Sequence, residues 1–272
     1  MSSTDTGVDF SLNRVAAMVR RYWYLLRSSW PRLLELVYWP AVQMLMWGFL
    51  QLYIAGNASF FARASGTFIG AVLLWDILFR GQLGFSISFL EEMWARNLGN
   101  LMISPLRPIE FVAALMIMSL IRLAIGMVPV SLLAIAFFGF NLYGLGLALA
   151  AFFVNLILTS WAIGILVSGL VLRNGLGAES LAWTIMFLLL PLTCVYYPVT
   201  TLPDWLQIFA WALPPTYVFE GMRTLLIDHS FRADLMLRAL ALNAALFAAA
   251  VVGFIALLDS ARRHGSLMQM GE

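Results

Sequence analysis

Long apolar segments dominate the pattern of hydrophobic and polar positions along the chain. Six of them predict membrane-spanning helices, because a helix rising 1.5 Å per residue needs about 20 apolar residues to cross a hydrocarbon core of about 30 Å. These predicted spans cover residues 33–54, 66–89, 110–138, 142–172, 180–197 and 235–258. Pro40 and Pro129 are expected to kink the first and third spans.

Three segments depart from this pattern. Residues 10–30 place apolar and aromatic side chains at helical spacing with arginines between them, which predicts an amphipathic helix along the membrane interface, or alternatively a soluble cytoplasmic helix. Residues 90–108 are polar and predict a short amphipathic helix at the membrane surface. Residues 198–233 contain four prolines and two apolar pieces too short to span, so they predict a re-entrant or interfacial helical hairpin.

The composition supports an all-α integral membrane protein. Hydrophobic residues make up 62% of the chain and charged residues 11%, whereas soluble domains carry roughly 25% charged residues. Short alternating segments, which a transmembrane β-barrel requires, are not visible. The predicted organisation is a cytoplasmic N-terminus with an interfacial helix (1–30), a six-helix transmembrane domain (31–258) and a cytoplasmic tail (259–272).

The charges predict both an orientation and several exclusions. Ten arginines fall in the termini and loops of one side and three in the loops of the other, so both termini are predicted to be cytoplasmic. All 16 basic residues are arginine, and a Walker A phosphate loop needs a lysine. We therefore expect no ATP hydrolysis by that route in this chain. No basic patch suggests a nucleic-acid partner.

Few residues offer catalytic or metal chemistry. The two histidines, His229 and His264, and the lone Cys194 do not suggest a metal cluster or a disulfide. Asp228, His229 and Ser230 are consecutive, so they cannot form a nucleophilic triad. The tryptophans within the spans are interpreted as packing or lipid-facing residues without a role in cargo binding: Trp39, Trp47, Trp75, Trp161 and Trp183.

Charged residues inside the spans are costly and need a partner or water. Asp76 and Arg122 lie at similar depths and could pair across adjacent helices, while Asp76 and Arg80 could pair within one helix. Such residues either line a path for cargo or lock the bundle structurally. Small residues suggest close helix contacts, namely Gly144, Gly146, Gly164, Ser168 and Gly169.

Three stretches together resemble the ABC-2 family of transporter permeases, the membrane subunits of type V ABC exporters. The first is the amphipathic segment that leads into the first span. The second is the polar pattern EE-x(4)-NL-x(2)-L-x(2)-SP at 91–105. The third and most specific is P-x(4)-P-x-WLQ, then LPPTY, then E-x(2)-R, at 198–223.

The resemblance implies a role for each stretch. The polar helix would be a coupling helix that contacts a separate ATPase, through Glu91, Glu92, Arg96, Asn97, Leu98 and Leu101. The first helix would be a connecting helix, with Arg20, Arg21, Tyr22 and Arg27 near the same partner. The hairpin would close the exit on the outer side, through Pro214, Pro215, Tyr217, Glu220 and Arg223.

It also implies the partners and the activity. The chain would be one half of a permease, in most cases a homodimer, in a bacterial plasma membrane, with two ATPase subunits and membrane lipid as its partners. ATP and Mg would bind to those subunits, and this chain itself would hold no cofactor. The cargo would be a hydrophobic or amphiphilic molecule, such as a drug, a lipid or a glycan-lipid. A non-transporting membrane scaffold or a membrane-embedded enzyme are the alternatives.

Overall fold

The computed structural model describes residues 10–57 and 66–263. The helices are α1 (Leu12–Arg27), α2 (Trp30–Asn57), α4 (Thr67–Trp94), α5 (Leu98–Ile103), α6 (Pro108–Phe138), α7 (Leu147–Asn174), α8 (Leu181–Leu192), α9 (Asp204–Trp211), α10 (Pro214–Asp228) and α11 (Ala233–Arg263). Within the described ranges no strand is present. Residues 1–9, Arg63, His264 and the rest of the predicted tail to residue 272 lie outside the described residues.

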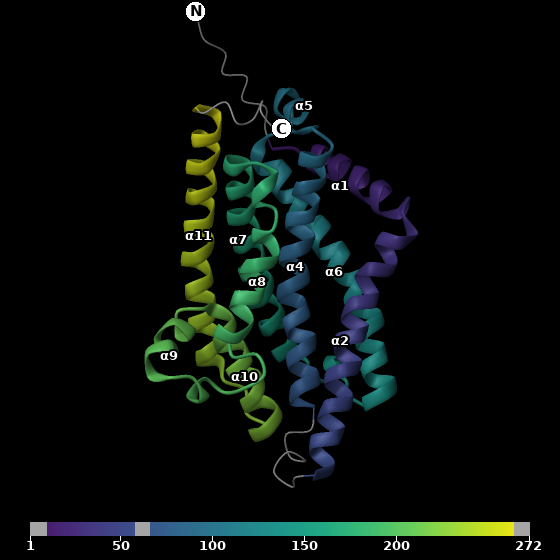
Figure 1. The fold of residues 1–272 in the computed structure, drawn as a ribbon, viewed down its shortest axis with the longest axis vertical. Coiled ribbons are helices and arrows are strands. Elements are labelled where there is room, and N and C mark those ends of the chain that lie inside the picture. Colours follow the sequence, from purple (N-terminus) through teal and green to yellow (C-terminus); the bar gives the residue numbers. More distant parts are fainter. Residues whose placement is uncertain (1–9, 58–65, 264–272) are drawn as a thin grey trace, which may run out of the picture.

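The long helices form one bundle in which α2 and α6 run in one direction and α4, α7 and α11 run in the other (Figure 1). Helix α4 lies at the centre and packs against α2, α6 and α7, while α11 packs mainly against α7. Within the most apolar 18-residue stretch of each helix, 83% of the α4 stretch is buried, against 17% of the α2 stretch and 11% of the α11 stretch. Apolar side chains that α2 and α11 leave uncovered suit lipid, so these two helices form the flanks of the bundle.

Five of the described helices are long and apolar enough to cross a membrane: α2, α4, α6, α7 and α11. The all-α membrane fold predicted from the pattern is therefore confirmed. The predicted fifth span, residues 180–197, is different: helix α8 has 12 residues and a length of about 18 Å, which is too short to cross alone. The chain turns at Cys194, whose φ is +54°, and continues into the segment that carries α9 and α10.

The α6–α7 connection differs from the expected pattern. Residues Leu142–Leu145 form a 3-10 turn, in which the Asn141 side chain accepts a hydrogen bond from the Tyr143 amide at 3.0 Å, so α7 begins five residues later than expected. Helices α2 and α6 continue through Pro40 and Pro129.

A close helix crossing accompanies Pro40. Because proline has no N–H, it cannot bond the carbonyl of Leu36 four residues earlier. That carbonyl oxygen is the atom that a Cβ on Gly126 of α6 would meet, at 2.6 Å. The missing hydrogen bond and the missing side chain thus lie at one α2–α6 contact, where a glycine allows the two backbones to approach.

Small and polar residues hold α7 against its neighbours. Gly164 packs on the ring of Phe85 in α4, and Gly169 packs on α11, which confirms the close contacts expected there. Gly146 instead has a φ of +56° in a turn, with nothing near its missing Cβ. Between α7 and α11, buried Asn243 bonds Thr159 at 2.6 Å and the Asn155 carbonyl at 2.9 Å.

Candidate functional site

The first candidate site is a cluster of ion pairs at the end of the bundle that carries α1 and α5. Glu110, in the first turn of α6, is completely buried and accepts two hydrogen bonds from Arg14 of α1, at 2.6 and 2.8 Å. It also accepts from the backbone amides of Ser11 and Arg107, at 2.7 and 3.0 Å. The hydrogen bonds that Arg14 donates to Glu110 raise the pKa of Arg14, so this pair stays charged.

A second pair ties the other half of α1 to α4. Glu92, in the last turn of α4, is completely buried and bonds both terminal nitrogens of Arg21, one of them at 3.2 Å. Its carboxylate also accepts from the Asn97 side chain at 2.8 Å. Burial raises the pKa of neighbouring Tyr22, and the charge of Glu92 raises it further. This tyrosine therefore stays neutral.

A third pair involves Glu91, which lies next to Glu92 in the sequence but points to the other side of α4. It binds Arg122 of α6 at 3.0 Å and Arg32 of α2 at 3.3 Å. Of the two pairings that the sequence left open for Asp76, the one with Arg122 is therefore not formed. Asp76 lies 3.7 Å from Arg80, one turn along its own helix. Arg122 reaches Glu91 because the long side chains of both residues bend toward each other from antiparallel helices.

These contacts change the interpretation of the acidic pair. Glu91 and Glu92 are the last acids of α4 rather than part of a separate polar helix, and intrachain arginines occupy both carboxylates. They hold α1, α2 and α6 around the end of α4 and offer no free charge to a partner. Arg20 and Arg27 of α1, in contrast, are exposed.

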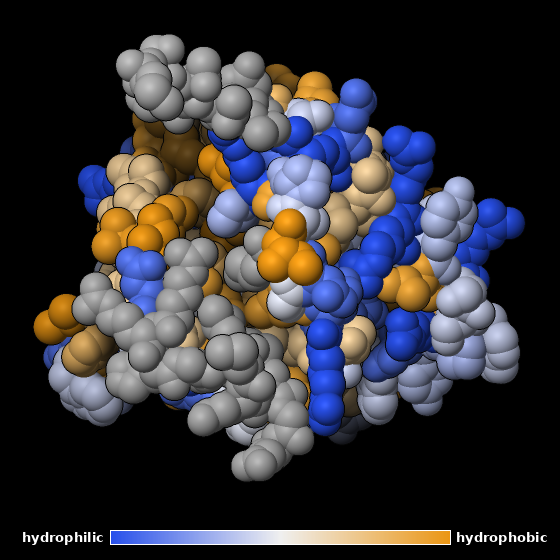
Figure 2. All heavy atoms as spheres, turned by 90° about the horizontal axis from the view of Figure 1, so that it is seen from above, coloured by the Kyte–Doolittle hydropathy of each residue, from blue (hydrophilic) through white to orange (hydrophobic). Residues whose placement is uncertain are grey.

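Helix α5 projects beyond the ends of the long helices (Figure 1). A short turn at Ala95–Asn97 connects it to α4, and Arg96 in this turn has a φ of +50°. Leu98 is buried and Leu101 packs on the core, whereas Asn100 is exposed and Ile103 is 85% exposed. Figure 2 looks onto this end and shows hydrophilic side chains gathered there, mostly on the side of α1.

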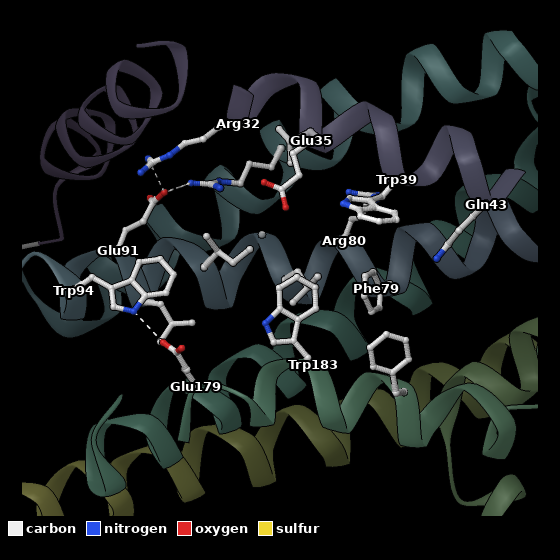
Figure 3. A pocket seen from close by; sticks show the side chains of 17 residues that line it. Arg32, Glu35, Trp39, Gln43, Phe79, Arg80, Glu91, Trp94, Glu179 and Trp183 are labelled. Carbon is white, nitrogen blue, oxygen red and sulfur yellow. Dashed lines mark hydrogen bonds and ion pairs between the residues drawn. The ribbon is translucent and has the colours of Figure 1, made fainter. Parts of the chain in front are cut away.

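The second candidate site is a cavity of about 560 Å³ between α2, α4 and the start of α8. Along the α2 and α8 walls, charged residues come first at the α1/α5 end and aromatic residues lie deeper, whereas the α4 wall has Trp94 at that end and Arg80 deeper (Figure 3). Helix α2 contributes Glu35 and then Trp39, and the α8 wall contributes Glu179 and then Trp183. The cavity is therefore amphipathic along its length. Trp39 and Trp183 line it and are 55% and 41% exposed, so neither ring is buried in the core of the bundle.

The comparisons with known proteins identify the family. The family model described as ABC-2 type transporter matches residues 14–227, more than three quarters of the chain. The chain belongs to the ABC-2 type transporter family. It is thus a permease component of an ABC-type transporter, and the family implies association with ABC ATPases. No match is found among the curated proteins.

In this ABC-2 permease, the proline-rich hairpin is tied to the loop that follows α8. Pro214 and Pro215 begin α10, where a missing N–H costs nothing, and both are buried. Glu220 and Arg223 pair at 2.9 Å, as their spacing predicts. Arg223 also donates to the carbonyl of Cys194 at 2.9 Å, and Glu220 accepts from the Val199 amide at 2.7 Å. The pair therefore anchors an irregular segment. Tyr217 packs against Trp211 of α9.

Some residues of both sites were not anticipated from the sequence of this permease. Arg14 and Glu110 are 96 residues apart and no local pattern joins them. Glu35 and Glu179 had no assigned role. The only sequence signal for the cavity is that each of these two glutamates precedes a tryptophan by four residues, which is one helical turn.

Proposed function

We propose that this chain is the membrane subunit of an ATP-driven exporter that moves a hydrophobic or amphiphilic cargo out of the cytoplasm or the inner leaflet. Two separate ATPase subunits would supply the energy, and a second permease subunit, in most cases an identical one, would complete the path. The membership in the ABC-2 family supports an ABC-type permease. The proposal that an ATPase drives the movement of cargo rests on the α1/α5 end of the bundle. There, helix α5 is joined through α4 to the wall of the cavity.

The proposed mechanism uses α4 as a lever. Helix α5 follows α4 after a three-residue turn, and the same α4 supplies Phe79, Arg80 and Glu91 to the cavity wall. The ion pairs of Glu91 and Glu92 bind α1, α2 and α6 to the end of α4. When ATP brings the two ATPases together, a push on α5 would move these helices as one body and change the width of the cavity.

The proposed orientation puts the α1/α5 end in the cytoplasm of a bacterial cell. Helices α4, α7 and α11 end there and α2, α6 and α8 start there, which gathers Arg14, Arg20, Arg21, Arg27, Arg32, Arg96, Arg107 and Arg173 at one end. Arginine is retained on the cytoplasmic side of membrane proteins. The hairpin with α9 and α10 would then face outward.

An experiment on α5 tests the link to the ATPase. The permease is co-expressed with an ABC ATPase encoded by a neighbouring reading frame, and both Ile103→Arg in α5 and Ile208→Arg in α9 are purified. These side chains are 85% and 73% exposed at opposite ends of the bundle. We expect Ile103→Arg to reduce co-purification and ATP hydrolysis strongly, and Ile208→Arg to leave both unchanged. Equal behaviour of the two variants would contradict the proposal.

Labelling tests the orientation. Cys194 is the only cysteine and is buried, so the labelling of a second, introduced cysteine can be measured without background from Cys194. A membrane-impermeant maleimide added to intact cells should label Thr200→Cys and spare Asn100→Cys until the membrane is opened. The reverse pattern would refute the assignment. Should an assembled, ATP-hydrolysing complex move no cargo, the scaffold alternative would be favoured instead.

A further inference from the structure

The cavity between α2, α4 and α8 contains two glutamates, Glu35 and Glu179, that form no ion pair within the described part of the chain, although the charge of Arg80 acts on Glu35 over a longer distance. Arg32 and Arg122 both bind Glu91, and Arg80 is paired with Asp76 behind the cavity wall. By contrast, neither Glu35 nor Glu179 has a cation within 4.0 Å among the described residues. Glu35 is exposed on the α2 wall, and Glu179 accepts only a neutral hydrogen bond from Trp94, at 2.9 Å.

Two of the three arginines that line the cavity, Arg32 and Arg122, are already paired with a carboxylate of its wall, that of Glu91. The Nε atoms of Arg80 and Arg122 have no hydrogen-bond partner, but both atoms are fully enclosed by protein and cannot reach a ligand. Arg122 uses one terminal nitrogen on both oxygens of Glu91. An anionic cargo would have to break these pairs at a cost, because a separated carboxylate in a low-dielectric site is left without compensation.

Aromatic rings surround the two open carboxylates. Trp39 follows Glu35 by one turn on α2, and Trp183 follows Glu179 by one turn on the opposite wall (Figure 3). Phe79 lies between them, with its ring centre 6.2 Å from that of Trp183 and 6.0 Å from that of Phe187. The faces of aromatic rings carry negative charge density and attract cations, tryptophan most strongly.

We propose that this cavity binds lipophilic organic cations, and that such molecules are the cargo class of the permease. The charged group would lie between Glu35 and Glu179, and the apolar body would lie deeper against Trp39, Trp183 and the phenylalanine rings. The cargo assignment rests on the proposed function. The binding assignment does not, because it follows from the charges and rings of the cavity alone.

The test compares two ions of nearly equal size and shape and opposite charge, tetraphenylphosphonium and tetraphenylborate. Their binding is measured by equilibrium dialysis against the purified permease–ATPase complex, with empty micelles subtracted. We expect the cation to bind at least tenfold more tightly than the anion. Because this comparison uses the unaltered protein, it does not depend on whether any variant folds. Equal binding, or tighter binding of the anion, would overturn the proposal.

Variants locate the site. Glu35→Gln and Glu179→Gln should each weaken tetraphenylphosphonium binding about tenfold, since each removes one of the two carboxylate charges that would lie beside the bound cation. Asp228→Asn, an exposed carboxylate at the other end of the bundle, serves as the matched control and should bind like the unaltered chain. Unchanged affinity in the Glu35→Gln/Glu179→Gln double variant, with monodisperse protein, would also overturn the proposal.

ATP-driven uptake into inverted proteoliposomes separates the two proposals. Cation binding without ATP-driven uptake of any cargo would refute the exporter and leave the binding site standing. ATP-driven transport in a complex that fails to prefer the cation would refute the binding site and leave the exporter standing.

Discussion

Replacing Glu92 by alanine should loosen the attachment of α1 to the rest of the bundle. The Glu92 carboxylate is completely buried and accepts hydrogen bonds from Arg21 and from the Asn97 side chain. Removing one partner of a buried ion pair costs about 3–5 kcal/mol. The Arg21 side chain is 38% exposed, so water recovers part of its solvation, and we expect a loss of about 2–3 kcal/mol.

Thermal unfolding of the purified chain in detergent, followed by circular dichroism, measures this loss. With about 2–4 °C for each kcal/mol in a chain of this size, the midpoint should fall by about 4–12 °C. The matched control is Arg20→Ala, which removes an exposed arginine next to Arg21. Among the described residues, its side chain makes only a long hydrogen bond within α1, to the Ala16 carbonyl at 3.4 Å. This control should lie within about 1 °C of the unaltered chain.

A double-mutant cycle separates the ion pair from general damage to the site. Combining Glu92→Ala with Arg21→Ala should cost less than the sum of the two single changes, with a coupling of about 1–2 kcal/mol. A coupling near zero would refute the reasoning, because it would mean that the carboxylate stabilises the fold without Arg21. A midpoint for Glu92→Ala equal to that of Arg20→Ala would refute it as well.

Three further predictions concern packing and reactivity. Gly126→Ala would place a Cβ 2.6 Å from the Leu36 carbonyl oxygen, so α2 and α6 must separate, and we expect a loss of about 1–3 kcal/mol in the same unfolding assay. Asn243→Ala removes the hydrogen bonds to Thr159 and Asn155 of α7 and should cost about 0.5–1.5 kcal/mol; a loss of about zero would count against this network. Burial raises the pKa of the Cys194 thiol to about 11, so below that pH the thiol stays protonated; native protein at pH 7.5 should react with maleimide far more slowly than unfolded protein, and equal rates would contradict the buried position.

The membrane fold itself could be predicted because its signals are local. An uninterrupted apolar stretch identifies a spanning helix wherever it occurs, and four of the six predicted spans, those that became α2, α4, α6 and α11, match long helices of the structure to within a few residues at most boundaries. The turn at Cys194 shortened α8 although the sequence stays apolar to residue 197, since hydropathy does not report where a backbone turns. The polar segment 90–108 was located correctly, but its division between α4 and α5 was not.

The sequence by itself determined that the chain crosses a membrane, that its arginines favour one end, and that three stretches resemble one transporter family. Only the tertiary structure decided which charges meet: Arg14 with Glu110, Arg21 with Glu92, and Arg122 with Glu91 rather than Asp76. It also decided that Glu35 and Glu179 share one cavity. The physical reason is that hydropathy and helix length belong to each segment, whereas ion pairs and cavities depend on how helices cross, which is set by packing between residues far apart in the chain.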